Sequence, residues 1–190
     1  MRTSSFHVGR CLAMVLAAVL SVTLVNPYPA FGQSSKSAAV AKELAQALDA
    51  AKLDAIAAPD PSDPSIFVAA LYFQGSQLLV VSAKYAAPPL LVEKIKSKNY
   101  RDVYIDLSSA SVAGSKSFVM DIGADGLSPK PGDAGPDSWE KGTQQVAFDG
   151  DWKKAKLSEE QYMKSYSEAD EQYTKMLSLL LAQAKGKGSA

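Results

Sequence analysis

Histidine and cysteine are almost absent from this sequence: His7 and Cys11 are the only examples, and both lie within its first 11 residues. We interpret residues 1–32 as a secretory signal peptide, so the mature chain is expected to contain neither residue type. Catalysis by a Ser–His–Asp or Cys–His arrangement needs a histidine base and is therefore excluded for the mature chain. Zinc sites built from histidine and cysteine are excluded as well, which leaves only oxygen ligands for a metal ion.

The signal peptide prediction depends on three successive zones. Arg2 and Arg10 form a cationic start without acidic residues, and an apolar run follows over residues 11–25. Residues 26–32 then supply two prolines and small residues, which place the expected cleavage before Gln33. An uncleaved membrane anchor is less well supported, because a membrane-spanning helix needs about 20 apolar residues. We expect the mature protein to be periplasmic or secreted, with no stable membrane anchor after cleavage.

Removal of a 32-residue leader from the 190-residue chain leaves 158 residues, which suits a single domain with a full hydrophobic core. We predict one domain over residues 33–184 and a disordered tail over residues 185–190. The leader holds two of the 20 Lys and Arg and none of the 20 Asp and Glu, so the mature chain has a formal net charge of −2. This balance provides no long-range field for nucleic acid, and nucleic-acid binding is not expected.

Periodicity in the first half of the chain predicts a helix followed by a β-hairpin. Apolar residues recur at steps of three and four from about Ser37 to Leu53, which is typical of an amphipathic helix. Two apolar runs at residues 66–73 and 78–81 are separated by a Gln-Gly-Ser-Gln sequence that suits a hairpin turn. Both runs are apolar on consecutive positions, so each strand is expected to bury both of its faces.

The second half of the domain alternates short elements with a long connection. We predict a short helix over residues 88–98, which opens with two prolines, and half-buried strands at residues 102–107 and 118–122. A loop rich in Gly and Pro is predicted from Gly123 to Gly142, and a last strand from Thr143 to Phe148.

The predicted loop over residues 123–142 is unusually long for a compact domain, so we expect it to be functional or mobile. Trp139 lies inside it. Because a loop offers a large apolar side chain no ordinary packing position, Trp139 is expected to act as a lid or to contact a partner.

Neither Asp-rich segment of the chain fits a calcium-binding loop. The segment that begins at Asp121 has Gly126 at the sixth position, but Gly132 occupies the twelfth position, where a carboxylate is needed. The segment that begins at Asp149 has Lys154 where glycine is needed. We interpret the first segment as a glycine turn that ends a strand, and we expect no metal site.

A long C-terminal helix is predicted to begin with the capping box Ser158-Glu159-Glu160-Gln161. Apolar residues then follow in steps of four and three, which allows two interpretations: a coiled-coil surface for a partner, or packing within the domain. Because the pattern covers fewer than four heptads, packing on the protein's own sheet or first helix is favoured. The apolar positions are Tyr162, Tyr166, Ala169, Tyr173, Met176, Leu180 and Ala184.

Candidate catalytic groups are few. Asp102 and Asp106 share a predicted strand face, but alternating carboxylates more often mark a solvent-facing side. Ser82 and Lys84 place a hydroxyl near an ammonium group at a strand end, where the lysine stays hydrated and charged. We therefore interpret these two residues as an ordinary hydrated strand end, with contact to an anion as the less favoured alternative. We assign no catalytic residue, and whether the protein is an enzyme is left open.

The order of these elements resembles the FMN-binding split barrel of the pyridoxamine-phosphate-oxidase-like superfamily. The resemblance extends over about half of the chain, from Ile66 to Trp152, and covers the apolar hairpin, the Lys-rich helix and the alternating strands. It implies an FMN cofactor at the subunit interface of a homodimer, with the flavin phosphate held at the end of the second barrel strand and around the following helix. The matching positions in this sequence are Ser82, Lys84, Lys98 and Arg101.

These patterns together predict an α+β fold, with an antiparallel β-sheet or split β-barrel flanked by an N-terminal helix and a long C-terminal helix. The favoured function is a noncatalytic exported domain, without a cofactor, that binds an unknown small ligand or protein partner. The alternative is an FMN-binding split-barrel protein acting as an oxidoreductase. Such a protein needs no histidine, because the cofactor carries the redox chemistry.

Overall fold

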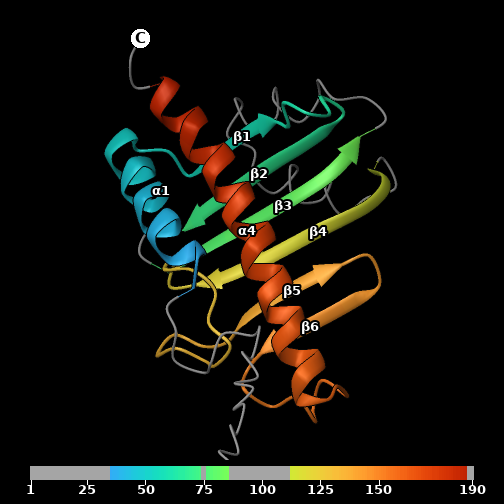
Figure 1. Ribbon diagram of the computed structural model, residues 1–190. Coiled ribbons are helices and arrows are strands. Elements are labelled where there is room, and N and C mark those ends of the chain that lie inside the picture. The colour runs from blue at the N-terminus through green and yellow to red at the C-terminus, as the bar shows by residue number, and fades with distance from the viewer. Residues whose placement is uncertain (1–34, 74–75, 86–111, 188–190) are drawn as a thin grey trace, which may run out of the picture.

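The computed structural model describes residues 35–73, 76–85 and 112–187, which fold into two helices on one antiparallel sheet (Figure 1). The α+β class predicted from the sequence is thereby confirmed, and the two helices are the first and the last described elements in chain order. In chain order the elements are α1 (Ser37–Ala51), β1 (Ala55–Pro59), β2 (Ile66–Phe73), β3 (Gln77–Tyr85), β4 (Val112–Ile122), β5 (Asp137–Lys141), β6 (Gln144–Phe148) and α4 (Glu159–Lys187).

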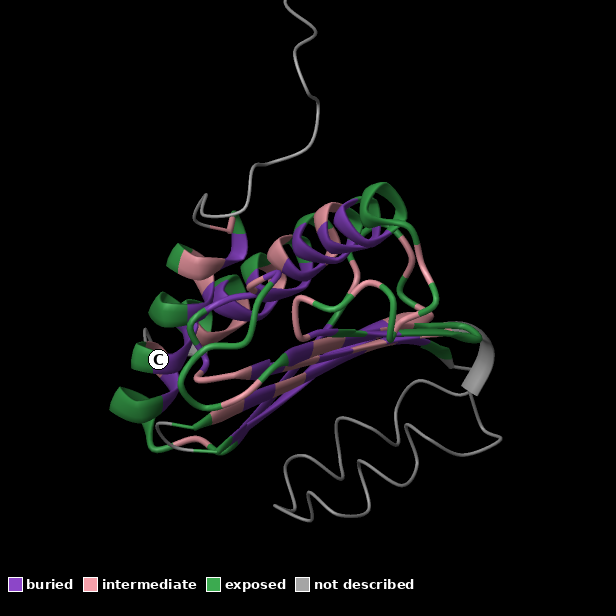
Figure 2. Ribbon diagram, turned by 90° about the horizontal axis from the view of Figure 1, so that it is seen from below, coloured by how far each residue is buried: buried purple, intermediate pink, exposed green. Residues whose placement is uncertain are grey.

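The six described strands form a meander in which every strand pairs antiparallel with the next one along the chain. Both helices lie on the same side of this sheet, and α4 crosses it diagonally (Figures 1 and 2). The main hydrophobic core fills the space between the helices and the sheet. No helix in the described part of the chain has both the length and the apolarity that a membrane span requires.

The β2–β3 hairpin confirms the strands predicted from the two apolar runs. Phe73 pairs with Gln77 across its turn, and residues 74–75 lie outside the described residues. Val68 and Ala70 on β2 belong to the core beneath the helices, whereas Phe67 and Ala69, which point the other way, are also buried. Both faces of β2 are therefore buried, as its consecutive apolar positions predicted.

Helix α4 begins with the predicted capping box. The Ser158 Oγ accepts a hydrogen bond from the amide of Gln161 at 3.1 Å, and the Gln161 Oε1 accepts one from the amide of Ser158 at 2.9 Å. The apolar positions from Tyr162 to Leu180 are buried against α1 and the sheet, which confirms packing within the domain. The helix continues to Lys187, past the predicted domain end at residue 184, and the Lys185 Nζ lies 2.6 Å from the Glu43 Oε1 on α1.

The predicted loop over residues 123–142 is wrong in its second half, because residues 137–141 form strand β5. Asp137 and Trp139 alternate with less buried residues, so the segment carries the two-residue period of a half-buried strand. Trp139 is 1% exposed and belongs to the core. The prediction of a lid or partner contact at Trp139 is therefore wrong, since the side chain fills the space between the sheet and α4.

Strand β1 is a further element that the sequence pattern did not predict. It is five residues long, rich in alanine, and ends at Pro59. It pairs with β2 through the register Ala55↔Leu71 to Pro59↔Phe67. A proline is tolerated here because β1 is an edge strand of the described sheet.

Some predicted elements lie outside the described residues. These are the helix at residues 88–98 and the strand at residues 102–107, together with Lys98 and Arg101. The described chain leaves the sheet at Tyr85 and returns at Val112, and these two residues pair across β3 and β4.

Candidate functional site

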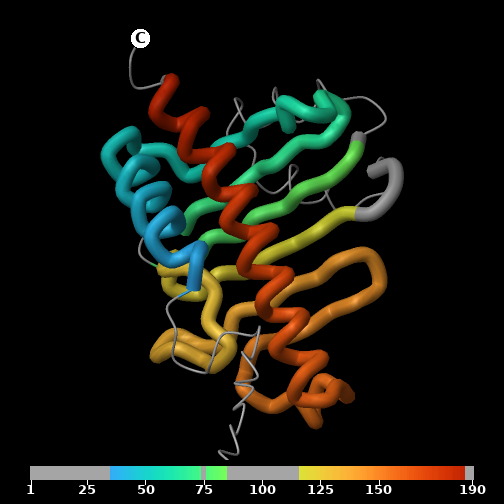
Figure 3. The backbone as a smooth tube through the Cα atoms, in the orientation of Figure 1, coloured from blue at the N-terminus to red at the C-terminus, as the bar shows by residue number. Residues whose placement is uncertain are grey.

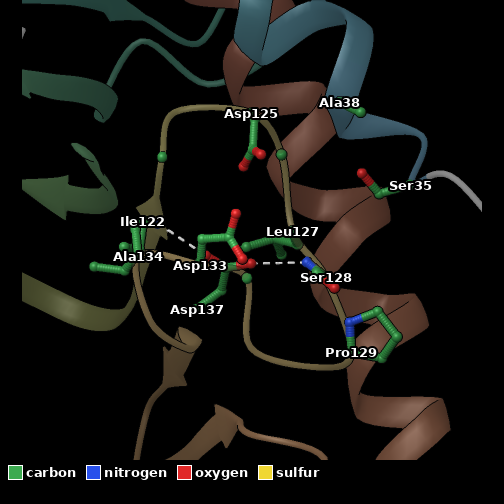
Figure 4. Close-up of a pocket in the computed structure, with 13 residues that line it drawn as sticks. Ser35, Ala38, Ile122, Asp125, Leu127, Ser128, Pro129, Asp133, Ala134 and Asp137 are labelled. Carbon is green, nitrogen blue, oxygen red and sulfur yellow. Dashed lines mark hydrogen bonds between the residues drawn. The ribbon is translucent and has the colours of Figure 1, made fainter. Parts of the chain in front are cut away.

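A pocket of about 400 Å³ lies between the connection from β4 to β5 and the beginning of α1. The tube in Figure 3 shows this connection, in yellow and orange, passing beside the N-terminal end of α1. Figure 4 shows the pocket from close by. Its lining residues are Ser35, Ala38, Ile122, Gly123, Asp125, Gly126, Leu127, Ser128, Pro129, Gly132, Asp133, Ala134 and Asp137.

The chain reverses direction directly after β4, where three of four turn positions adopt positive φ angles. These angles are 107° at Gly123, 54° at Ala124 and 95° at Gly126. At Gly126 a Cβ atom would lie 2.5 Å from the Cα and the amide nitrogen of Ala38, so only glycine fits. The predicted glycine turn is confirmed, and it brings the connection into contact with the first turn of α1.

Asp121, at the end of β4, is a buried carboxylate that holds this turn. It accepts hydrogen bonds from the amides of Asp125 at 3.2 Å and Gly126 at 2.9 Å, and from the hydroxyl of Tyr173 at 2.9 Å. Burial raises the pKa of Asp121 to about 6, although the three hydrogen bonds act in the opposite direction. The nearby charge of Asp125 raises the pKa further.

Asp137, the first residue of β5, closes the connection at its other end. Its carboxylate accepts hydrogen bonds from the amides of Ile122 at 2.8 Å and Ser128 at 2.7 Å (Figure 4). Burial raises the pKa of Asp137 to about 7, and the charges of Asp121 and Asp125 add to the effect. A group with this pKa gains or loses its proton close to neutral pH.

Tyrosines of α4 support the connection from the helix side. The Tyr162 hydroxyl donates to the carbonyl of Pro129 at 3.0 Å, and the Tyr166 hydroxyl donates to the carbonyl of Leu127 at 3.1 Å. The burial of Tyr166 raises its pKa, so its hydroxyl stays protonated and remains a donor. One face of α4 therefore supplies both the apolar core and the hydrogen-bond donors that fix the pocket wall.

Asp170 of α4 fixes the other wall by capping α1. The residue at the helix start, Lys36, has no side-chain cap of its own. Instead, the Asp170 carboxylate accepts hydrogen bonds from the amides of Lys36 at 2.7 Å and Ser37 at 3.1 Å, and from the Ser37 Oγ at 2.6 Å. The Ser37 Oγ in turn accepts from the amide of Leu127 at 3.0 Å, which ties α1 to the connection.

The pocket is acidic. Asp125, Asp133 and Asp137 line it, and no lysine, arginine or histidine is found among the described residues of its lining. Figure 4 shows the Asp125 side chain directed toward the space in which Asp133 and Asp137 lie. Asp125 and Asp133 are exposed, whereas Asp137 is buried. Chemically, this arrangement can accept hydrogen bonds from a cationic group and neutralise its charge.

Of the residues predicted to hold a flavin phosphate, the two that the structure describes, Ser82 and Lys84, do not line this pocket. Ser82 and Lys84 share one face of β3, and Ser82 pairs with Ser117, whereas Ile122 at the pocket pairs with Gln77 at the other end of β3. The Lys84 Nζ lies 3.3 Å from the Asp63 Oδ2. Lys98 and Arg101 lie outside the described residues, so the four-residue flavin site stays a prediction.

Sequence reasoning missed this acidic pocket. Asp121 begins a segment that does not fit a calcium-binding loop, and Asp125 and Asp137 both lie inside the predicted loop over residues 123–142. The sequence of residues 137–141, Asp-Ser-Trp-Glu-Lys, contains a single apolar residue, so it carries no alternating signal for strand β5 or for the position of Asp137. Within the described ranges, no group of three or more His, Cys, Asp or Glu residues is arranged to hold a metal ion.

Comparison of the chain with protein-family models, with curated proteins and with solved structures gave no match.

Proposed function

We propose that this protein is an exported, noncatalytic domain whose acidic pocket binds a small polar ligand carrying an amino or guanidino cation. The observation that carries the proposal is the convergence of Asp125, Asp133 and Asp137 on a pocket of about 400 Å³, whose described lining residues include no basic side chain. Pockets for small molecules commonly enclose about 300–1,000 Å³. Export rests on the leader predicted for residues 1–32.

The lining suits a molecule with a cationic end and a short carbon chain. Asp125 and Asp133 are exposed, so their oxygens can accept hydrogen bonds from an ammonium or guanidinium group. Leu127 and Pro129 supply an apolar wall for the carbon atoms of the ligand. Each hydrogen bond to a charged group contributes about 1.5–3 kcal/mol, so two such contacts correspond to dissociation constants of about tens of micromolar to several millimolar.

A binding role agrees with how the two buried carboxylates are used. Both oxygens of Asp137 accept main-chain hydrogen bonds, and both oxygens of Asp121 are similarly engaged. These groups therefore hold the pocket wall in place, and their raised pKa values follow from burial. The exposed carboxylates of Asp125 and Asp133 remain for contact with a ligand.

Binding of a cation is expected to depend on pH through Asp137. A positive charge in the pocket favours the ionised form of this carboxylate, so it lowers the pKa of Asp137 below about 7. Binding then releases a proton, and affinity increases as the pH rises from 6 to 8.

Isothermal titration calorimetry of the mature protein with 1,4-diaminobutane and with arginine amide tests this proposal, and 1,4-butanediol serves as the uncharged probe. We expect the cations to bind more tightly at pH 8 than at pH 6, and the diol not to bind. The double variant Asp125→Asn, Asp133→Asn should lose at least about tenfold in affinity, because it removes two charge-assisted contacts. Asp151→Asn, an exposed carboxylate outside the pocket, is the matched control and should bind normally.

Two results would contradict this proposal: equal binding of the diol and the diamine, or an unchanged affinity in the double pocket variant. The flavin alternative is tested in the same samples by the absorption spectrum after incubation with FMN. A bound flavin band that disappears in the Lys84→Ala, Arg101→Ala double variant would favour the alternative. The two sites are distinguishable, because Lys84 does not line the acidic pocket.

A further inference from the structure

The two edge strands of the described sheet differ in how they are protected. On one edge, β1 ends at Pro59, and a proline blocks the addition of a further strand. On the other edge, β6 contains neither proline nor a charged residue. Gln144, Gln145 and Ala147 on β6 are exposed. The β6 edge therefore lacks the features by which proteins usually prevent strand addition, apart from its short length.

The hydrogen-bond pattern shows which backbone groups of β6 face outward. The amide of Gly142 donates to the carbonyl of Lys116 on β4, so even-numbered residues of β5 hydrogen-bond toward β4. In an antiparallel sheet the direction alternates along the strand, so the odd-numbered residues of β5 hydrogen-bond toward β6. Gln145 and Ala147 lie opposite the even-numbered Glu140 and Ser138. Their amide and carbonyl groups therefore point away from β5.

These outward groups have no other partner in the described structure. No residue of the described ranges outside β5 hydrogen-bonds to the backbone of Gln145 or Ala147. Two exposed residues thus present two amides and two carbonyls in a row at one sheet edge. Such a row is a template for an added strand.

We propose that the β6 edge pairs with the β6 edge of a second copy of this chain, so that one antiparallel sheet runs through a two-fold symmetric dimer. In the register centred on Val146, Gln145 of each copy lies opposite Ala147 of the other. This register uses all the outward backbone groups of both strands and forms four hydrogen bonds. Because β6 carries no charge, self-pairing brings no like charges together, and an isologous contact of this kind closes as a dimer.

Residue parity is consistent with the same register. Directly opposed residues in an antiparallel pair point to the same face of the sheet. Val146 is buried beneath α4, so the Val146 side chains of the two copies would lie side by side on the helix-covered face. The exposed side chains of Gln145 and Ala147 would meet on the opposite face. This inference does not depend on the ligand proposed for the acidic pocket.

Analytical ultracentrifugation of the mature protein tests the proposal. Protein concentrations from about 1 to about 200 µM cover the range in which a weak dimer forms and dissociates. We expect a concentration-dependent dimer. Ala147→Pro should make the protein monomeric, because it removes an outward amide without removing a hydrogen bond to β5. Ala147→Ser keeps the amide and is the matched control. Thermal unfolding of both variants shows whether the fold is retained.

A cross-linking experiment keeps the proposal testable if Ala147→Pro fails to fold. The variants Gln145→Cys and Ala147→Cys are mixed and oxidised, which is clean because the expected mature chain has no other cysteine. We expect a disulfide between the two different variants to form faster than one between identical copies, since residues 145 and 147 are directly opposed. A protein that stays monomeric throughout, or a dimer unaffected by Ala147→Pro, would overturn the proposal.

Discussion

Two regions of this domain are held together by different interactions, although α4 contributes to both. In the first region, between the helices and the middle of the sheet, apolar side chains such as Leu44, Val80 and Leu180 are fully buried. In the second region, around the β4–β5 connection, buried carboxylates accept hydrogen bonds from main-chain amides and tyrosines. The first region is stabilised by the burial of apolar area, which does not depend on pH, whereas the second depends on groups that titrate.

The difference shows how one helix can serve two purposes. Met176 and Leu177 of α4 pack in the apolar core. Tyr162, Tyr166 and Asp170, about two to four turns earlier, direct hydrogen-bonding groups at the pocket wall and α1. Along α4, apolar contacts that do not depend on pH are therefore combined with polar contacts to groups that titrate, and the two contributions can be tested at different residues. The following predictions do so, beginning with the largest expected effect.

Leu180→Ala should destabilise the protein by about 2–5 kcal/mol, the usual cost of removing a fully buried leucine side chain. Because no titrating group is involved, the loss should be the same at pH 5 and pH 8. Urea unfolding followed by circular dichroism measures it. Lys175→Ala, at an exposed position on the same helix, is the control and should change stability by about 0.5 kcal/mol or less. A strongly pH-dependent loss in Leu180→Ala would contradict the separation of the two regions.

The stability of the parent protein should decrease as the pH rises from 5 to 8. An aspartate in an unfolded chain has a pKa of about 3.9, whereas burial raises the pKa of Asp121 to about 6 and of Asp137 to about 7. The folded state then binds more protons than the unfolded state between about pH 4 and 7. The contribution of Asp121 and Asp137 to the free energy of unfolding is therefore fully present below about pH 4 and is lost as the pH rises through about 7. One pKa unit corresponds to about 1.4 kcal/mol, so the decrease between pH 5 and 8 should be about 2–4 kcal/mol.

The Asp137→Asn variant isolates this effect. An amide does not ionise, so the pH dependence of the free energy of unfolding should become shallower. Asp151→Asn, which removes an exposed carboxylate, should keep the parental slope. Urea unfolding midpoints at pH 5, 6, 7 and 8 give the comparison, and an unchanged slope in Asp137→Asn would show that this residue does not titrate as its burial requires.

Asp170→Ala should destabilise the protein by about 2 kcal/mol, because it leaves the amides of Lys36 and Ser37 and the Ser37 hydroxyl without their acceptor. Hydrogen exchange should increase at the start of α1 and at Leu127, whose amide bonds to Ser37. Glu168→Ala, at an exposed position on α4, is the control. Unchanged exchange at Leu127 would show that α1 and the pocket wall are not linked through Ser37.

The apolar region could largely be predicted from the sequence, because its signal is local. Three- and four-residue steps indicated α1 and α4, and consecutive apolar residues indicated β2 and β3. Strands β1 and β5 escaped prediction because one is a short alanine-rich segment ending at a proline and the other follows a stretch dense in glycine and proline. A five-residue strand of this composition gains its structure from its neighbours rather than from its own propensity.

The polar region could not be predicted, because its contacts join residues far apart in the chain. Asp121 meets Tyr173 across 52 positions, and Leu127 meets Ser37 across 90. The sequence neighbours of each of these residues form no motif that indicates the contact. Only the closing of the β4–β5 connection over α1 and α4 turns isolated aspartates into a lined pocket.

The contact between Ser37 and Asp170 spans 133 positions of the sequence. During synthesis from the N-terminus, the residues of α1 are made long before Asp170. The first amides of α1 therefore have no acceptor from α4 until most of the chain has been made. The apolar hairpin β2–β3, by contrast, can form from neighbouring residues alone. A chain that ends before Asp170 therefore lacks the acceptor that caps α1 and holds Ser37 against the amide of Leu127.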